Sequence, residues 1–300
     1  MDRRRFVTDG MAAAALVQST LMTQDSLQTA IIPSSGERIP RIGLGTWQVF
    51  DVGEDAAARL RLLETLRAFT GAGGCVVDTS PMYGTAESVI GDLVAEGNLR
   101  AGVWLATKVW TRGERDGIGQ LETSLRRLRA PVVELLQVHN LLDWKVHLRT
   151  LRAWKEQGRT RYVGVTHYQA SAFDDLARVL KAEPLDFVQV NVSLDEPEAV
   201  QRILPLCAER GVAVLANRPF GGGGSFARVR GTPLPRWVAD HGITSWAQFL
   251  LRWVLAHEAV TCAIPGTGNP RHVRDNLDAA RGSALDATVR DRLAATWRGL

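Results

Sequence analysis

Short apolar runs alternate with amphipathic stretches from residue 31 onward, and this alternation constrains the fold more than any other feature of the chain. Each run is continuous and rich in β-branched residues, as is typical of strands buried on both faces of a parallel sheet. There are eight, at residues 42–44, 75–77, 103–106, 133–138, 162–165, 187–190, 212–215 and 260–264. Eight strand–helix alternations predict either a closed parallel barrel or a doubly wound sheet.

The stretches between these runs have the periodicity of helices. In residues 56–70, Leu60, Leu63, Leu66 and Phe69 are spaced three residues apart, so we expect them to share the buried face of one helix. The even number of strands and the absence of an early G-x-G-x-x-G motif favour a (β/α)8 TIM barrel over a doubly wound sheet.

The chain divides into a short N-terminal segment and a barrel domain. Barrels of this kind run to about 250 residues as one domain, so we assign residues 31–300 to a single (β/α)8 domain. A β-hairpin is predicted at its start, because residues 31–33 and 39–40 are apolar and flank the turn-forming sequence Ser34-Ser35-Gly36. Residues 1–30 are assigned to a leader.

The leader carries a pattern found in export signals. Arg3-Arg4-Arg5-Phe6 precedes a weakly apolar stretch at residues 11–17 and resembles a twin-arginine signal, which directs folded proteins to a translocon. That interpretation predicts a periplasmic protein with the translocon as a partner. Asp2 and the lack of an A-x-A cleavage site depart from the pattern, so a disordered basic tail on a cytoplasmic protein is the alternative. A membrane span needs about 20 apolar residues, and no stretch of the chain qualifies.

The charge distribution and the cysteines argue against a nucleic-acid partner, a disulfide framework and a metal site. The net charge is +4, and arginine is spread along the chain with no dense basic run beyond the N-terminus, so we expect no nucleic-acid partner. The three cysteines, Cys75, Cys207 and Cys262, form no C-x-x-C motif and lie in or beside apolar stretches. We therefore expect neither a disulfide framework nor a metal site.

Polar residues follow almost every predicted strand at its carboxyl end, where (β/α)8 barrels build their active sites. In strand order they include Asp78 with Tyr83, Lys108, His139, Thr166 with His167, Gln189, Asn217 with Arg218, and Gly266 with Thr267. Each alone has an ordinary structural explanation, such as helix capping by Asp78. Their joint occurrence at one rim predicts a catalytic or binding site.

These residues lie in motifs that resemble the aldo-keto reductases over residues 31–280. The matching segments are 43–47 (GLGTW), 78–84 (DTSPMYG), 106–110 (ATKVW), 135–139 (LLQVH), 164–168 (GVTHY) and 264–267 (IPGT). The resemblance implies an NAD(P)H-dependent oxidoreductase. Such an enzyme transfers a hydride between a nicotinamide cofactor, bound without a Rossmann domain, and the carbonyl group of a small aldehyde or ketone.

The same resemblance assigns the chemistry to Tyr83, Lys108, Asp78 and His139. Hydride attack builds negative charge on the carbonyl oxygen, and Tyr83 would supply the proton that this oxygen needs. A phenol with a pKa of about 10 is a weak acid near neutrality, so we expect the Lys108 ammonium to lower the pKa of Tyr83. Asp78 would hold Lys108 in place, and His139 would donate a hydrogen bond to the carbonyl oxygen.

The cofactor contacts that the resemblance implies fall on less typical residues. Asn217, beside Arg218, replaces the aromatic ring that usually stacks on the nicotinamide, and Gly266 replaces the lysine that usually holds the 2′-phosphate. His272 stands at the place of a usual arginine, and Arg271 and Arg274 are close enough in sequence to compensate. The complete cofactor-binding set is Thr166, His167, Gln189, Asn217, Arg218, Gly266, Thr267, Arg271 and Asn276. We expect NADPH to be preferred, with NADH as the alternative.

Two other functions stay open beside the reductase. A non-catalytic nicotinamide-binding sensor or auxiliary subunit could use the same fold, and the altered nicotinamide contacts leave room for it. A barrel aldolase could use Lys108 as a Schiff base, although it would give Tyr83 and His139 no joint role.

Trp47 and Trp110 are expected to form apolar walls of the substrate pocket, but the motifs do not identify the carbonyl compound.

Overall fold

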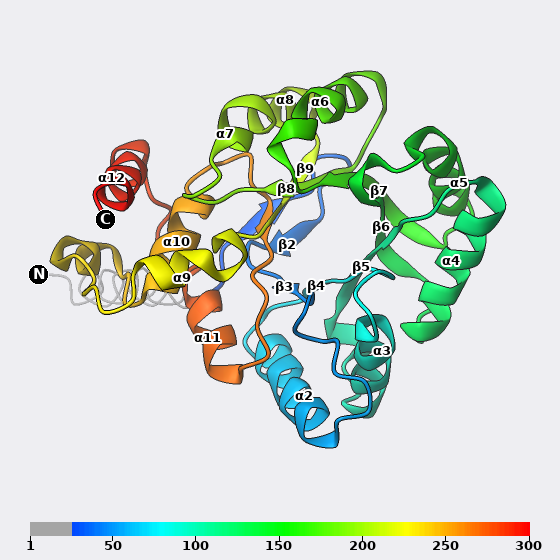
Figure 1. The fold of residues 1–300 in the computed structure, drawn as a ribbon, viewed down its shortest axis with the longest axis horizontal. Helices are drawn as coiled ribbons and strands as arrows, with labels where there is room; N and C mark the ends of the chain where they lie inside the picture. Colours follow the sequence, from blue (N-terminus) through cyan, green and yellow to red (C-terminus); the bar gives the residue numbers. More distant parts are fainter. Residues whose placement is uncertain (1–25) are drawn as a thin grey trace, which may run out of the picture.

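Parallel strands form the inner wall of the protein, whose computed structural model describes residues 26–300 (Figure 1). Eight strands are hydrogen-bonded in the order β10-β9-β8-β7-β6-β5-β4-β3. Their bounds are β3 Leu44–Gly45, β4 Val76–Asp78, β5 Trp104–Val109, β6 Val133–Val138, β7 Thr160–His167, β8 Phe187–Asn191, β9 Ala213–Asn217 and β10 Cys262–Ala263. All eight predicted strands are therefore confirmed.

Isolated bridges join the first and last strands and close the barrel. Ile42 pairs with Ala263, and Gly45 pairs with Gly266, both in parallel. A Cβ atom on Gly45 would lie 2.8 Å from the carbonyl oxygen of Ile264, so only glycine allows the two strands to approach this closely. This close approach gives the second glycine of the GLGTW motif a structural reason, and it confirms the (β/α)8 fold.

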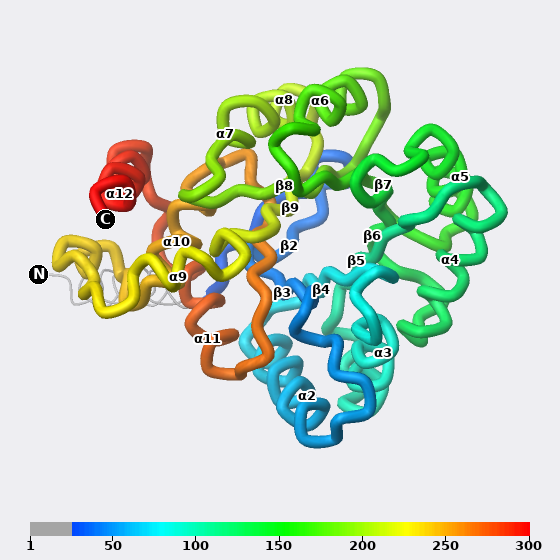
Figure 2. The backbone as a smooth tube through the Cα atoms, in the orientation of Figure 1, coloured from blue at the N-terminus to red at the C-terminus, as the bar shows by residue number. Residues whose placement is uncertain are grey.

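Helices surround the strands on the outside, as the ribbon and the smooth backbone tube both show (Figures 1 and 2). The helices are α2 Ala56–Gly71, α3 Ala86–Glu96, α4 Glu114–Arg127, α5 Trp144–Glu156, α6 Phe173–Ala182, α7 Glu198–Arg202, α8 Leu204–Arg210, α9 Gly224–Arg228, α10 Trp246–Leu255, α11 Pro270–Asp278 and α12 Ala287–Arg298. Short 3-10 helices add η1 Arg100–Gly102, η2 His139–Leu141, η3 Ala170–Ala172, η4 Gly221–Gly223 and η5 Arg236–His241. None of the described helices is both long enough and apolar enough to cross a membrane.

A hairpin closes the amino end of the barrel. Strands β1 Thr29–Ile31 and β2 Arg38–Pro40 pair antiparallel, as predicted. Ile32 and Ile39 are buried and belong to a cluster with the aromatic side chains of Trp104, Tyr162 and Phe187. Because this end is filled by apolar side chains, the polar groups of the barrel gather at the opposite, carboxyl end.

The structure corrects three local expectations. Leu60 is 57% exposed, and Leu62 takes its place on the buried face of α2. The stretch at residues 200–208, between the predicted strands at 187–190 and 212–215, has the periodicity of one helix but belongs to two, α7 and α8, which meet at Ile203. The hairpin begins at Thr29, inside the segment assigned to the leader, while Arg3-Arg4-Arg5-Phe6 and the rest of residues 1–25 lie outside the described residues.

Candidate active site

The carboxyl ends of β4 and β5 bring a lysine and an aspartate together inside the barrel. Lys108 Nζ donates to Asp78 Oδ2 at 2.8 Å and to the carbonyl oxygen of Thr79 at 2.7 Å. The Lys108 side chain is fully buried, and Asp78 is almost so. Burial lowers the pKa of Lys108, but attraction to Asp78 and Tyr83 raises it by more, so its net pKa lies above the ordinary value and the amine stays protonated.

Tyr83 lies in the loop between β4 and α3, next to this pair. The Lys108 ammonium is 5.2 Å from the centroid of the Tyr83 ring. Burial raises the pKa of Tyr83, the Lys108 charge lowers it, and Asp78 raises it again, so that the net pKa lies above its ordinary value. Lys108 acts in the expected direction, but it offsets only part of the effect of burial.

His139 begins η2, directly after β6, and faces Tyr83. The two rings meet edge to face with their centroids 6.1 Å apart, and the Trp110 ring lies 6.4 Å from His139. Burial, together with the charges of Lys108 and His167, lowers the pKa of His139 to about 2. The imidazole is therefore neutral at any working pH, and a neutral imidazole can donate one hydrogen bond without carrying a charge.

Two buried glutamines complete the surroundings of Asp78. Gln189 Nε2 donates to Asp78 Oδ1 at 2.9 Å, and Gln137 Nε2 lies 3.4 Å from the same oxygen. Gln189 is a predicted cofactor residue whose amide nitrogen here points to the carboxylate. Gln137 has no role in the sequence interpretation, although it stands in the segment LLQVH. Its strand position, two residues before His139, is the signal that could have found it.

Unpartnered polar atoms gather at the ends of β6, β8 and β9. The buried atoms Asn140 Oδ1, Asn191 Oδ1, Asn217 Oδ1 and Arg218 Nε have no hydrogen-bond partner among residues 26–300. Buried polar groups are normally paired, so such a group of orphans at one rim fits a polar ligand that supplies the missing partners. Asn217 and Arg218 are predicted cofactor residues. Asn140 and Asn191 are additional, and only their place after a strand signals them.

The remaining predicted cofactor residues occupy the same end of the barrel. Thr166 and His167 end β7, where Thr166 Oγ1 accepts from the backbone N–H of Asn140 and His167 Nδ1 accepts from the backbone N–H of Gln169. Gly266 and Thr267 follow β10.

Helix α11 carries the last two residues of the cofactor-binding set, Arg271 and Asn276, together with Arg274, which was expected to assist Arg271. Arg271 and Arg274 are exposed, and neither side chain has a hydrogen bond or ion pair within the described part of the chain. Asn276 is 4% exposed and lies on the inner face of the helix. Two unpaired guanidinium groups on one helix fit an anionic group such as a phosphate.

The predicted substrate walls are partly open to solvent. Trp47 follows β3 and is 47% exposed, and Trp110 follows β5 and is 41% exposed. Large aromatic side chains exposed beside buried polar groups are typical of the mouth of a ligand site.

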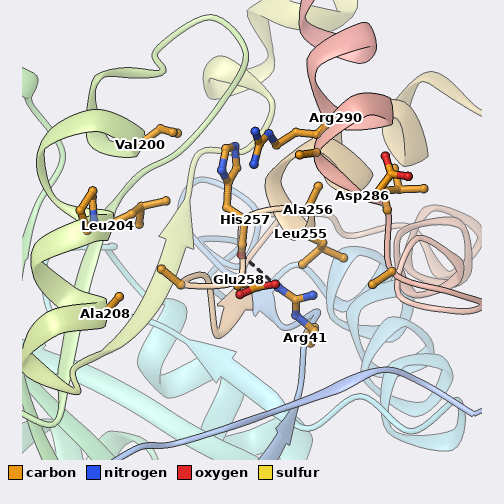
Figure 3. Close-up of a pocket in the computed structure, with 15 residues that line it drawn as sticks. Arg41, Val200, Leu204, Ala208, Leu255, Ala256, His257, Glu258, Asp286 and Arg290 are labelled. Atoms are coloured by element: carbon orange, nitrogen blue, oxygen red, sulfur yellow. Dashed lines mark hydrogen bonds between the residues drawn. The ribbon is translucent and has the colours of Figure 1, made fainter.

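A separate pocket of about 530 Å³ lies at the amino end of the barrel, away from these residues (Figure 3). Arg41 lines it and donates to the carbonyl oxygens of His257 and Val260 at 3.3 and 2.9 Å. Asp78, Tyr83, Lys108 and His139 do not line this pocket. Arg41 therefore links the segment before β3 to the loop before β10 by hydrogen bonds. The candidate catalytic residues lie at the opposite, carboxyl end of the barrel.

Comparisons with known proteins agree with this arrangement. A model of the aldo/keto reductase family matches residues 41–298. Methylglyoxal reductase YeaE from Escherichia coli (strain K12) is 30% identical over 262 residues, which are 83% of this chain and 89% of that protein. Glyoxal reductase from Bacillus subtilis (strain 168) is 26% identical over 84% of this chain and 87% of its own.

A solved structure is similar over nearly the full length. The aldo-keto reductase from Klebsiella pneumoniae, crystallised in complex with NADPH, superposes with a TM-score of 0.76. It is 27% identical, and the match covers 91% of this chain and 95% of that one.

Proposed function

The chain belongs to the aldo/keto reductase family, and we propose that Tyr83, Lys108, Asp78 and His139 are the residues that carry out its reaction. It is an NAD(P)H-dependent oxidoreductase that acts on the carbonyl group of small aldehydes or ketones. The observation that carries the residue assignment is the buried Lys108–Asp78 ion pair beside Tyr83 and His139, at the carboxyl end of the barrel.

Each side chain has a distinct task in reduction. Bound NADPH supplies the hydride. Neutral His139 donates a hydrogen bond to the carbonyl oxygen, which orients the substrate and stabilises the developing charge. The Tyr83 hydroxyl gives its proton to that oxygen, and the positive charge of Lys108 stabilises the phenolate that remains. Asp78 keeps Lys108 charged and fixed.

The cofactor is held along the same rim. Two aldo-keto reductase structures from Klebsiella pneumoniae were solved with NADPH or NADP bound, and we propose the same cofactor here. Thr166, His167 and Gln189 would hold the carboxamide, and Asn217 and Arg218 would replace the usual ring and contact the cofactor with their unpaired polar atoms. The rim continues to Gly266 and Thr267 and to α11.

Arg271 and Arg274 are proposed to bind the 2′-phosphate that distinguishes NADPH from NADH. We expect the Arg271→Ala/Arg274→Ala double variant to lose about 10- to 150-fold in affinity for NADPH, because a charge-assisted hydrogen bond to phosphate is worth about 1.5–3 kcal/mol. Affinity for NADH should stay unchanged. Titration of cofactor fluorescence measures both constants, with Arg298→Ala, an exposed arginine on α12, as the control. A ratio of the two affinities equal to that of the parent would show that these arginines do not read the phosphate.

Small dicarbonyl aldehydes are the substrates that we propose to test first. Relatives act on methylglyoxal and glyoxal according to their names. Trp47 and Trp110 would supply the apolar walls, and His139 the hydrogen bond that holds the reacting oxygen. A panel of aldehydes and ketones, with each nicotinamide in turn, would rank them by kcat/KM.

We also propose that the chain is exported in the folded state through the twin-arginine translocon, with its cofactor already bound. Arg3-Arg4-Arg5-Phe6 supports the proposal, since a ligand acquired in the cytoplasm is a reason to fold before crossing. We expect the native chain in the periplasmic fraction and the Arg3→Lys/Arg4→Lys variant in the cytoplasmic fraction. Equal retention of both chains in the cytoplasm would refute export.

A further inference from the structure

Ser80 lies two residues after Asp78 and is completely buried. Its Oγ is 3.2 Å from His139 Nδ1, and the side chain makes no other hydrogen bond with the described residues. His139 is 7% exposed, and its second ring nitrogen, Nε2, has no partner within residues 26–300. The pair therefore joins the loop after β4 to the start of η2 through one contact.

The single contact decides which nitrogen of His139 carries the proton. A neutral imidazole has one N–H donor and one acceptor nitrogen, while a serine hydroxyl can donate one hydrogen bond and accept others. If Nδ1–H donated to Ser80 Oγ, the hydroxyl proton of Ser80 would be buried without an acceptor, which is costly. If Ser80 donates to Nδ1, both groups are satisfied, and the imidazole proton must be on Nε2.

We propose that Ser80 is a positioning residue that holds His139 in the tautomer with its proton on Nε2, the nitrogen that is free to donate to a substrate oxygen. This inference rests on the proposed role of His139 in carbonyl reduction. The neighbouring charge of Lys108 lowers the pKa of His139 and so keeps the ring neutral, which leaves a single ring proton for the contact with Ser80 to place. Among the described residues Ser80 is the hydrogen-bond partner of Nδ1, so its hydroxyl sets which nitrogen carries the proton.

Nitrogen NMR tests the tautomer directly. The full chain, labelled with ¹⁵N-histidine, is observed at neutral pH, and His139 is assigned by comparison with His139→Gln. We expect the parent to carry the His139 proton on Nε2, and Ser80→Ala to show a mixture of the two tautomers. A proton on Nδ1 in the parent, or an unchanged tautomer in Ser80→Ala, would overturn the proposal.

Kinetics tests the consequence for the reaction. We expect Ser80→Ala to lower kcat/KM by about five- to tenfold, the size of effect that one buried neutral hydrogen bond produces. Ser124→Ala, which removes a buried hydroxyl from α4, should leave the rate unchanged. A parental rate in Ser80→Ala would contradict the positioning role. A parental rate in His139→Gln would instead refute the proposed role of His139, and the NMR result would still decide the tautomer.

Discussion

Replacing Tyr83 by phenylalanine is expected to lower the rate of carbonyl reduction by about 10²–10⁴-fold, the range that general acid catalysis supplies. Phenylalanine keeps the ring that packs against His139 and lies beside the Lys108 ammonium, but it removes the only proton that the side chain can give. Cofactor affinity should stay near the parental value, because the assigned cofactor contacts are on other strands. Steady-state rates and a cofactor titration measure the two quantities.

Tyr162→Phe is the matched control for this prediction. Tyr162 lies at the amino end of the barrel, where its hydroxyl contacts Ser35 and Glu37. Tyr162→Phe therefore also removes one phenol hydroxyl, but at a position far from the proposed chemistry. Its activity should stay close to that of the parent. Turnover of Tyr83→Phe within tenfold of the parent would show that another group protonates the carbonyl oxygen.

Replacing Lys108 by methionine is expected to impair both stability and catalysis. The substitution leaves the buried Asp78 carboxylate without its cation, and breaking a buried ion pair on one side costs about 3–5 kcal/mol of unfolding free energy. The net pKa of Lys108 is raised in the folded protein. The stabilisation of the folded state by the Lys108–Asp78 ion pair is therefore fully present at neutral pH. It is lost only as the pH rises above about 10.4, the ordinary pKa of lysine. Urea unfolding at neutral pH measures the loss.

The pH profile separates a catalytic Lys108 from a structural one. Reduction needs the protonated phenol of Tyr83, so the rate falls as the pH rises through the pKa of that group. Lys108 lowers this pKa, and its removal must raise it, so the alkaline limb of the profile should move to higher pH while the remaining rate drops. Lys181→Met, an exposed lysine on α6, should change neither quantity. An unchanged profile with a modest loss of rate would make Lys108 a structural residue only.

The strands were predictable because the barrel buries them on both faces. The short, largely apolar run at residues 133–138 is typical of a buried parallel strand, and β6 has these bounds. The strand ends were less predictable. Lys108, His167 and Asn217 belong to their strands rather than to the loops that follow, because the barrel interior becomes polar toward its carboxyl end.

Contacts between distant residues could not be read from the chain. Ser80 and His139, like Asp78 and Gln137, are 59 residues apart, and only the parallel register of β4, β5 and β6 brings their side chains together. The pKa of Tyr83 shows the same limit. Its nearest charge was evident from the family motif, but the larger effect of burial depends on the packed site.

A single-turnover experiment decides between a carbonyl reductase and a nicotinamide-binding sensor. The chain is mixed with less than one equivalent of NADPH, methylglyoxal is added, and the absorbance of the reduced nicotinamide is followed. We expect the absorbance to be lost with the parent and retained with Tyr83→Phe, although both proteins bind the cofactor. Tight binding of NADPH by the parent, without oxidation by any aldehyde or ketone of the panel, would contradict carbonyl reduction by this site and favour a nicotinamide-binding sensor.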